Sequence, residues 1–126
     1  MLNNVRILIL EDEPLIAMEL AELISNAGGT VVASTRTVRD ALDFASQASI
    51  DIALLDVHLG SETSLDVAEK LKGLGIPFLL CTGDGKDHVH FANWPSVPVI
   101  VKPYKSGVVV EALSLLIQAE LGPGTA

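Results

Sequence analysis

Residues 5–14 read Val-Arg-Ile-Leu-Ile-Leu-Glu-Asp-Glu-Pro, an apolar run that stops at three acidic residues and a proline. A short apolar run without polar alternation is typical of a strand covered on both faces. Proline suits the first turn of a helix, so the stretch predicts a strand, an acidic turn and then a helix over 15–27. The buried face of this helix is expected to carry four apolar residues: Ile16, Leu20, Leu23 and Ala27.

The same alternation of strand and helix continues along the chain. Further strands are expected at 30–34, 51–56, 76–81 and 97–101, and further helices at 38–48, about 64–74 and 106–121. Strands that alternate with helices predict a doubly wound α/β fold, in which a five-stranded parallel sheet has helices on both faces. Between the last two strands, only 86–92 has room for a helix, of barely two turns. We therefore expect a short or mobile fourth helix.

Composition narrows the class of protein. The chain has 126 residues, of which 49% are hydrophobic and 19% charged, as expected for one globular domain over 1–121 with a disordered tail at 122–126. A net charge of −8 without a basic run argues against a nucleic-acid partner. No signal peptide or membrane-spanning stretch is apparent, so a cytoplasmic location without membrane contact is expected. Cys81, the single cysteine, lies in an apolar run and is predicted to be a buried thiol.

Polar side chains stand where four of the predicted strands end. Glu11 and Asp12 follow the first strand and Asp56 ends the third, while Thr82 and Lys102 follow the fourth and fifth. In an open parallel sheet these ends lie at one edge, where ligands bind. The sequence therefore predicts that three carboxylates, a hydroxyl and an ammonium group come together.

This combination favours phosphoryl transfer. Clustered carboxylates repel one another unless a cation joins them, and an all-oxygen site suits Mg²⁺. Lys102 can pair with a carboxylate at rest and with a phosphate oxygen after transfer, Thr82 can donate to another oxygen, and Asp56 can act as the nucleophile. Taken singly, these residues have plainer interpretations as helix-start acids, caps or an exposed lysine. Their joint occurrence at four strand ends is what favours the functional interpretation.

The acidic pair, Leu-Asp-Val-His-Leu at 55–59, Thr82 and Lys102-Pro103 resemble the response-regulator receiver family over about residues 4–121. The resemblance implies a CheY-like, flavodoxin-like sheet with strand order 2-1-3-4-5. It also implies that Asp56 accepts a phosphoryl group from a phosphohistidine on a sensor histidine kinase or a phosphotransfer protein.

By the same resemblance, Mg²⁺ would be held by four groups: the side chains of Glu11, Asp12 and Asp56 and the main-chain carbonyl of His58. Thr82 and Lys102 would bind the phosphoryl group and begin the switch. His58 and Asp84 occupy the positions two beyond Asp56 and Thr82, where side chains tune dephosphorylation in this family. The plainer interpretation of both is a solvated loop residue.

The chain departs from the family pattern at the switch. Most receivers carry an aromatic residue three positions before the lysine, but Val99 stands there. Tyr104 is the nearest aromatic, for which a packing role is the more expected one. Thr82-Gly83 matches part of a Phe-Ala-Thr-Gly motif found in a subset of mostly stand-alone receivers, although Leu80 and Cys81 replace its first two residues.

Several functions remain open from the sequence. The preferred one is a stand-alone phosphorelay receiver, a monomer or weak dimer without small-molecule turnover. It would contact a downstream protein through the fifth strand's face and the last helix, where Val108 and Leu115 form a second apolar side. Alternatives are a receiver cut from a hybrid histidine kinase, or a Mg²⁺-dependent aspartyl-phosphate phosphatase, in which a second acid usually stands at the position of His58. A flavodoxin-like mononucleotide binder is disfavoured, because residues 11–13 would repel phosphate.

Overall fold

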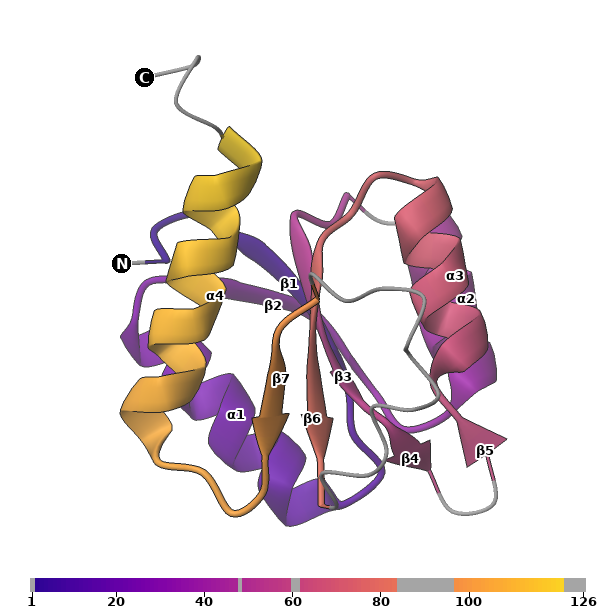
Figure 1. Ribbon diagram of the computed structural model, residues 1–126, viewed down its shortest axis with the longest axis horizontal. Helices are drawn as coiled ribbons and strands as arrows, with labels where there is room; N and C mark the ends of the chain where they lie inside the picture. The colour runs from indigo at the N-terminus through magenta and orange to yellow at the C-terminus, as the bar shows by residue number, and fades with distance from the viewer. Residues whose placement is uncertain (1, 48, 60–61, 84–96, 122–126) are drawn as a thin grey trace.

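The computed structural model describes residues 2–47, 49–59, 62–83 and 97–121 (Figure 1). Five strands form one parallel sheet in the order β2-β1-β3-β6-β7. They are β1 (Arg6–Leu10), β2 (Thr30–Thr35), β3 (Ile52–Asp56), β6 (Phe78–Thr82) and β7 (Val99–Val101). The predicted doubly wound α/β fold and its strand order are confirmed.

Helices cover both faces of this sheet. They are α1 (Pro14–Asn26), α2 (Val38–Gln47), α3 (Leu65–Gly73) and α4 (Ser106–Leu121). In Figure 1, α1 and α4 lie on one face and α2 and α3 on the other. The short helix expected at 86–92 and the tail expected at 122–126 lie outside the described residues.

Burial of the strands on both faces explains their apolar sequences. In β1, Leu8 and Leu10 belong to the core beneath α2 and α3, while Ile7 and Ile9 belong to the core beneath α1 and α4. All five residues of β3, the central strand, are buried. Successive side chains of a strand point to opposite faces, so a strand between two helical layers needs apolar residues at every position.

The structure corrects some predicted boundaries and one helix face. The fully buried residues of α1 are Ala17, Leu20 and Ile24, whereas Ile16, Leu23 and Ala27 are only half-buried. All four predicted residues face the core, but the most buried stripe is centred about one residue further round the helix. β6 begins at Phe78 rather than at residue 76, and Pro77, which has no N–H, contributes only its carbonyl to Ala53 of β3.

A small hairpin after β3 was not predicted. His58–Leu59 (β4) pairs antiparallel with Glu62–Thr63 (β5). Strands of two residues have no measurable periodicity, so the sequence gives no sign of them. The backbone N–H of Ser64 then donates to the carbonyl of Val57, 3.0 Å away, where α3 begins. The hairpin thus sits directly beside the carboxyl end of β3.

Candidate functional site

The strand ends that carry the predicted site residues all lie at one edge of the sheet, the lower edge in Figure 1. Backbone hydrogen bonds continue just past the strands there: Glu11 N–H donates to Thr35 (3.0 Å), Val57 to Cys81 (2.9 Å) and Lys102 to Thr82 (2.7 Å). These bonds hold the chain in register at the point where each polar residue leaves the sheet. The predicted meeting of the strand ends is therefore present.

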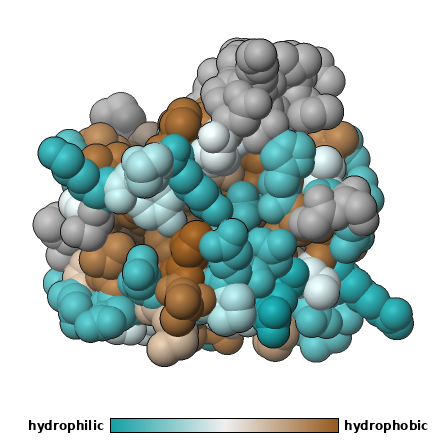
Figure 2. Space-filling model, turned by 90° about the horizontal axis from the view of Figure 1, so that it is seen from below, coloured by the Kyte–Doolittle hydropathy of each residue, from teal (hydrophilic) through white to brown (hydrophobic). Residues whose placement is uncertain are grey.

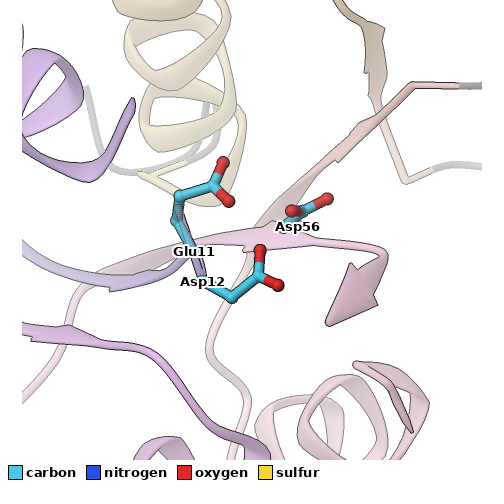
Figure 3. Close-up of side chains that lie close together, drawn as sticks. All are labelled: Glu11, Asp12 and Asp56. Atoms are coloured by element: carbon cyan, nitrogen blue, oxygen red, sulfur yellow. The ribbon is translucent and has the colours of Figure 1, made fainter. Parts of the chain in front are cut away.

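Three carboxylates meet at this edge (Figure 3). One oxygen of each of Glu11, Asp12 and Asp56 lies within 4.8 Å of the others. Glu11 and Asp56 are buried, with 2% and 8% of their surface exposed, while Asp12 is half-exposed. Carboxylate oxygens around a partly open space are the ligands that a small hard cation such as Mg²⁺ prefers, and Mg²⁺ usually keeps several of its waters. The donor set fits this ion.

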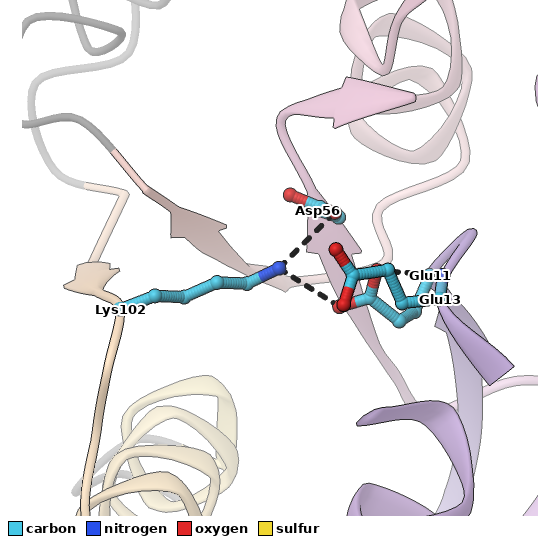
Figure 4. Close-up of polar contacts among 4 residues, drawn as sticks. All are labelled: Glu11, Glu13, Asp56 and Lys102. Atoms are coloured by element: carbon cyan, nitrogen blue, oxygen red, sulfur yellow. Dashed lines mark hydrogen bonds and ion pairs between the residues drawn. The ribbon is translucent and has the colours of Figure 1, made fainter. Parts of the chain in front are cut away.

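Lys102 enters the cluster from β7 on the opposite side (Figure 4). Its Nζ lies 2.9 Å from Oε1 of Glu11 and 3.2 Å from Oδ2 of Asp56. The other oxygen of Glu11 accepts the backbone N–H of Glu13 at 3.2 Å. One ammonium group cannot balance three ionised carboxylates, so the site has an excess of negative charge that a divalent cation would neutralise.

The two buried carboxyls titrate in opposite directions. Burial, together with the nearby Glu11 carboxylate, raises the pKa of Asp56 to about 7, although Lys102 opposes this shift. Burial also acts to raise the pKa of Glu11, but hydrogen bonds from Lys102, Asp56 and the Glu13 backbone outweigh it and hold that pKa below its usual value. Burial disfavours the Lys102 ammonium, yet Glu11 and Asp56 raise its pKa above the ordinary lysine value. The cluster therefore holds Glu11 and Lys102 charged and leaves Asp56 able to take up a proton.

A pH dependence of stability follows for the metal-free protein. The pKa of Asp56 is about 7 in the folded chain against 3.8 in the unfolded chain, so folding favours the protonated form. The free energy of unfolding should fall as pH rises from about 5 to about 7, on the order of 2 kcal/mol. Glu11 contributes in the opposite sense, but only at lower pH. Urea unfolding without Mg²⁺ measures the slope, which Asp56→Asn should remove. A wild-type stability that is flat or rises over this range would contradict the assignment.

The remaining predicted residues have different surroundings. Thr82 is buried at the end of β6, beside Val101 in the register. His58 is exposed on β4, opposite Thr63, directly after the β3 end that carries Asp56. Asp84 lies outside the described residues. Val99 is 38% exposed and opposite Leu80.

Tyr104 has the packing role expected from the sequence, but its hydroxyl has unexpected surroundings. It is half-buried against the core beneath α1 and α4, and its hydroxyl is buried with no hydrogen-bond partner among the described residues. The Lys102–Pro103 peptide bond that precedes it is cis. Burial, and the proximity of Cys81, raise the pKa of Tyr104 to about 12. The sequence indicated the packing role and the position two residues after Lys102, but not the burial of the hydroxyl.

Cys81 is buried as predicted, with 2% of its surface exposed, and burial raises the pKa of its thiol to about 12. Because the thiolate is the reactive form, the folded protein should react with a disulfide reagent roughly a thousandfold more slowly than an unperturbed thiol. The coloured thiol that the reagent releases is followed by its absorbance. The rates with and without denaturant then give the ratio between the folded and the unfolded protein. Equal rates in the two conditions would show that the thiol is accessible.

The surface around the carboxyl edge of the sheet contains both hydrophobic and hydrophilic residues. Figure 2 looks onto it from below and shows hydrophobic and hydrophilic residues side by side. In the described part of the chain, three elements each expose two large apolar side chains: Leu15 and Met18 on α1, Val99 and Val101 on β7, and Val108 and Leu115 on α4. Single exposed ones are Phe44 on α2 and Leu74 just after α3. The second apolar side expected for the last helix is therefore present.

The fold and this site define a class: a doubly wound α/β domain with an acidic, lysine-bearing pocket at the carboxyl edge of its sheet. The response regulator receiver domain family matches residues 7–114. The chain therefore belongs to this family of two-component signalling domains, as the sequence predicts. Receiver domains interact with histidine kinases or phosphotransfer proteins, bind Mg²⁺ at an acidic pocket and generally accept phosphoryl groups without acting as enzymes.

Individual relatives agree with this membership. The chain is 40% identical to SdrG from Sphingomonas melonis Fr1, whose solution structure it matches with a TM-score of 0.79 over 94% of this chain and 100% of that one. It is 33% identical to the phyllosphere-induced regulator PhyR of Methylorubrum extorquens over 85% of this chain and 43% of that protein. It is 28% identical to the transcriptional regulatory protein PdtaR of Mycobacterium tuberculosis over 89% of this chain and 56% of that protein. The chain thus spans about half the length of these curated relatives.

The sequence predicts no membrane-spanning stretch, and the described helices agree with this. Within 2–47, 49–59, 62–83 and 97–121, no helix has both the length and the apolar character that crossing a bilayer requires.

Proposed function

We propose that Asp56 is the phosphoacceptor of this receiver domain and takes its phosphoryl group from a phosphohistidine on a sensor histidine kinase or phosphotransfer protein. The observation that carries the proposal is the position of the Asp56 carboxylate, which lies 3.2 Å from Lys102 Nζ and has a carboxylate oxygen of Glu11 and one of Asp12 within 4.8 Å. Of the three clustered acids, Asp56 ends the central strand β3. Burial and the neighbouring Glu11 also raise the pKa of Asp56 above its usual value.

The transfer step follows from these contacts. An Asp56 carboxylate oxygen attacks the phosphorus of phosphohistidine, a P–O bond forms, the P–N bond breaks, and the leaving imidazole nitrogen takes up a proton. Catalysis of such a transfer consists largely of positioning and charge stabilisation. Lys102 would exchange its contact with Asp56 for one with a phosphoryl oxygen, and the Thr82 hydroxyl would donate to another. Hydrolysis of the acyl phosphate returns the Asp56 carboxylate and inorganic phosphate.

Glu11, Asp12, Asp56 and the main-chain carbonyl of His58 would hold Mg²⁺, which supplies positive charge to the phosphoryl oxygens when bound. Removing the metal should therefore suppress phosphorylation without unfolding the domain. Glu11 and Lys102 would stay paired in the metal-free state, since their contact of 2.9 Å does not depend on the metal. His58 and, outside the described residues, Asp84 would tune the lifetime of the phosphoryl group.

The output of the domain is proposed to be protein contact. Val108 and Leu115 of α4 are 45% and 58% exposed, and Val101 of β7 is 50% exposed. Such apolar surface at the edge strand and the last helix suits a protein partner. A monomer or weak dimer is proposed for the domain itself.

Intact-mass measurement tests the phosphoacceptor. Incubation with a small phosphodonor and Mg²⁺ should add one phosphoryl group to the wild type, and chelation of Mg²⁺ should prevent the addition. Repeated turnover of a small phosphoester, with release of phosphate far in excess of protein, would instead favour an aspartyl-phosphate phosphatase.

A further inference from the structure

The Tyr104 hydroxyl is in an unfavourable position. It is buried and lacks a hydrogen-bond partner among the described residues. A buried hydroxyl of this kind has lost its hydrogen bonds to water without gaining others. A rotation of the ring that gives the hydroxyl a hydrogen-bond partner would therefore lower the free energy of this group. The packing around the ring must offset this cost in the observed position.

The ring also has room to move. Tyr104 borders a cavity of about 300 Å³ whose other lining residues are Ile16 and Glu19 of α1 and the pair Lys102 and Pro103. Glu19 is the carboxylate among these residues and can accept a hydrogen bond from a phenol. The same cavity therefore offers both a path for the ring and a partner for its hydroxyl.

Lys102 links this cavity to the acidic site. Its side chain lines the cavity, while its Nζ bridges Glu11 and Asp56. A change in what the ammonium group binds therefore changes the wall of the cavity that Tyr104 also lines. No other aromatic residue in the described ranges is so placed, because Phe44 lies on α2 and Phe78 at the opposite end of β6. Val99 has no polar group with which to respond.

We propose that Tyr104 is a positioning residue that couples the phosphoryl state of Asp56 to the surface between α1 and α4. The inference rests on the proposed phosphorylation of Asp56. When Lys102 exchanges its contact with Asp56 for one with a phosphoryl oxygen, its side chain shifts in the cavity wall and the Tyr104 ring turns until its hydroxyl donates to Glu19. The turn moves an aromatic ring against α1, so a partner meets a different surface before and after phosphorylation.

A single fluorine probe tests the movement, because Tyr104 is the only tyrosine of the chain. The protein is labelled with 3-fluorotyrosine, and its one protein ¹⁹F resonance is followed while Mg²⁺ and beryllofluoride, an analogue of the phosphoryl group, are added. The resonance should move to a new position in the wild type. In Asp56→Asn, which cannot bind the analogue, it should stay where it is.

Variants test the hydrogen bond itself. Tyr104→Phe keeps the ring but removes the hydroxyl. It should weaken beryllofluoride binding about fivefold or more, the coupling expected of one such switch contact. It should also raise the melting temperature of the unloaded protein, since it removes a buried hydroxyl that has no partner among the residues described. A purely structural role would alter both states alike. Glu19→Ala should weaken beryllofluoride binding similarly, whereas Glu22→Ala, one turn further along α1 and outside this cavity, should not.

The possible results distinguish the coupling role of Tyr104 from the proposed phosphorylation of Asp56. If beryllofluoride loads Asp56 but the tyrosine resonance does not move, and Tyr104→Phe binds as tightly as the wild type, the coupling role is wrong while the phosphoacceptor stands. If neither beryllofluoride nor a phosphodonor loads the wild-type protein, the proposed function itself is overturned, and the coupling with it.

Discussion

Replacing Asp56 with asparagine is expected to abolish phosphoryl addition completely while making the metal-free protein more stable. The amide keeps the shape of the carboxyl but is a poor nucleophile, so no acyl phosphate forms. At pH 8 the wild-type carboxyl, with a pKa of about 7, is ionised in a buried site beside Glu11. Removing that charge should raise the free energy of unfolding by about 1–3 kcal/mol. Intact mass reports the first effect and urea unfolding without Mg²⁺ the second.

Asp66→Asn is the matched control for this substitution. Asp66 is an exposed acid in the first turn of α3, outside the carboxylate cluster. Its replacement should leave phosphoryl addition intact and change stability little, since surface substitutions usually lie within about 0.5 kcal/mol. A phosphoryl group on Asp56→Asn would show that another residue is the acceptor. Loss of stability in that variant would show that the Asp56 charge is better compensated than the contacts indicate.

Replacing Lys102 with glutamine should have the opposite effect on stability. Its Nζ is the cation in contact with both Glu11 and Asp56, so the variant leaves two buried carboxylates without their partner. The free energy of unfolding without Mg²⁺ should fall by about 2 kcal/mol, less than for a fully buried pair because the lysine side chain is 21% exposed. Mg²⁺ should restore more stability to this variant than to the wild type, since the metal then supplies the missing positive charge.

Lys105→Gln provides the comparison. Lys105 is an exposed lysine three residues further along the chain, and its loss should change neither the metal-free stability nor the response to Mg²⁺. Urea unfolding gives the free energy of unfolding of both variants, each with and without Mg²⁺. If Lys102→Gln and Lys105→Gln behave alike, the contacts of Lys102 with Glu11 and Asp56 contribute nothing to the folded state.

The alternation of strands and helices was predictable because the central strands β1, β3 and β6 lie between two helical layers and are almost entirely apolar. The order of acids, threonine and lysine at four strand ends was predictable too, since parallel strands bring their carboxyl ends to one edge. The hairpin of His58–Leu59 and Glu62–Thr63 was not, because two-residue strands have no periodicity. The buried face of α1 was misplaced by one residue, because an α-helix with apolar residues on several sides does not indicate which stripe meets the sheet.

By itself, then, the sequence determined the fold class, the edge at which the site lies and the chemical groups that meet there, because these follow from local periodicity and from the rules of parallel sheets. Only the tertiary structure decided which of these groups form ion pairs and in which direction their pKa values shift. Lys102 contacts Glu11 across 91 residues and also holds Asp56, and the pKa of Asp56 rises while that of Glu11 falls. The same is true of the buried Tyr104 hydroxyl, which has no hydrogen-bond partner in the described part of the chain and lies beside a cavity. Distances and burial between distant segments set these properties, and no local pattern in the chain encodes them.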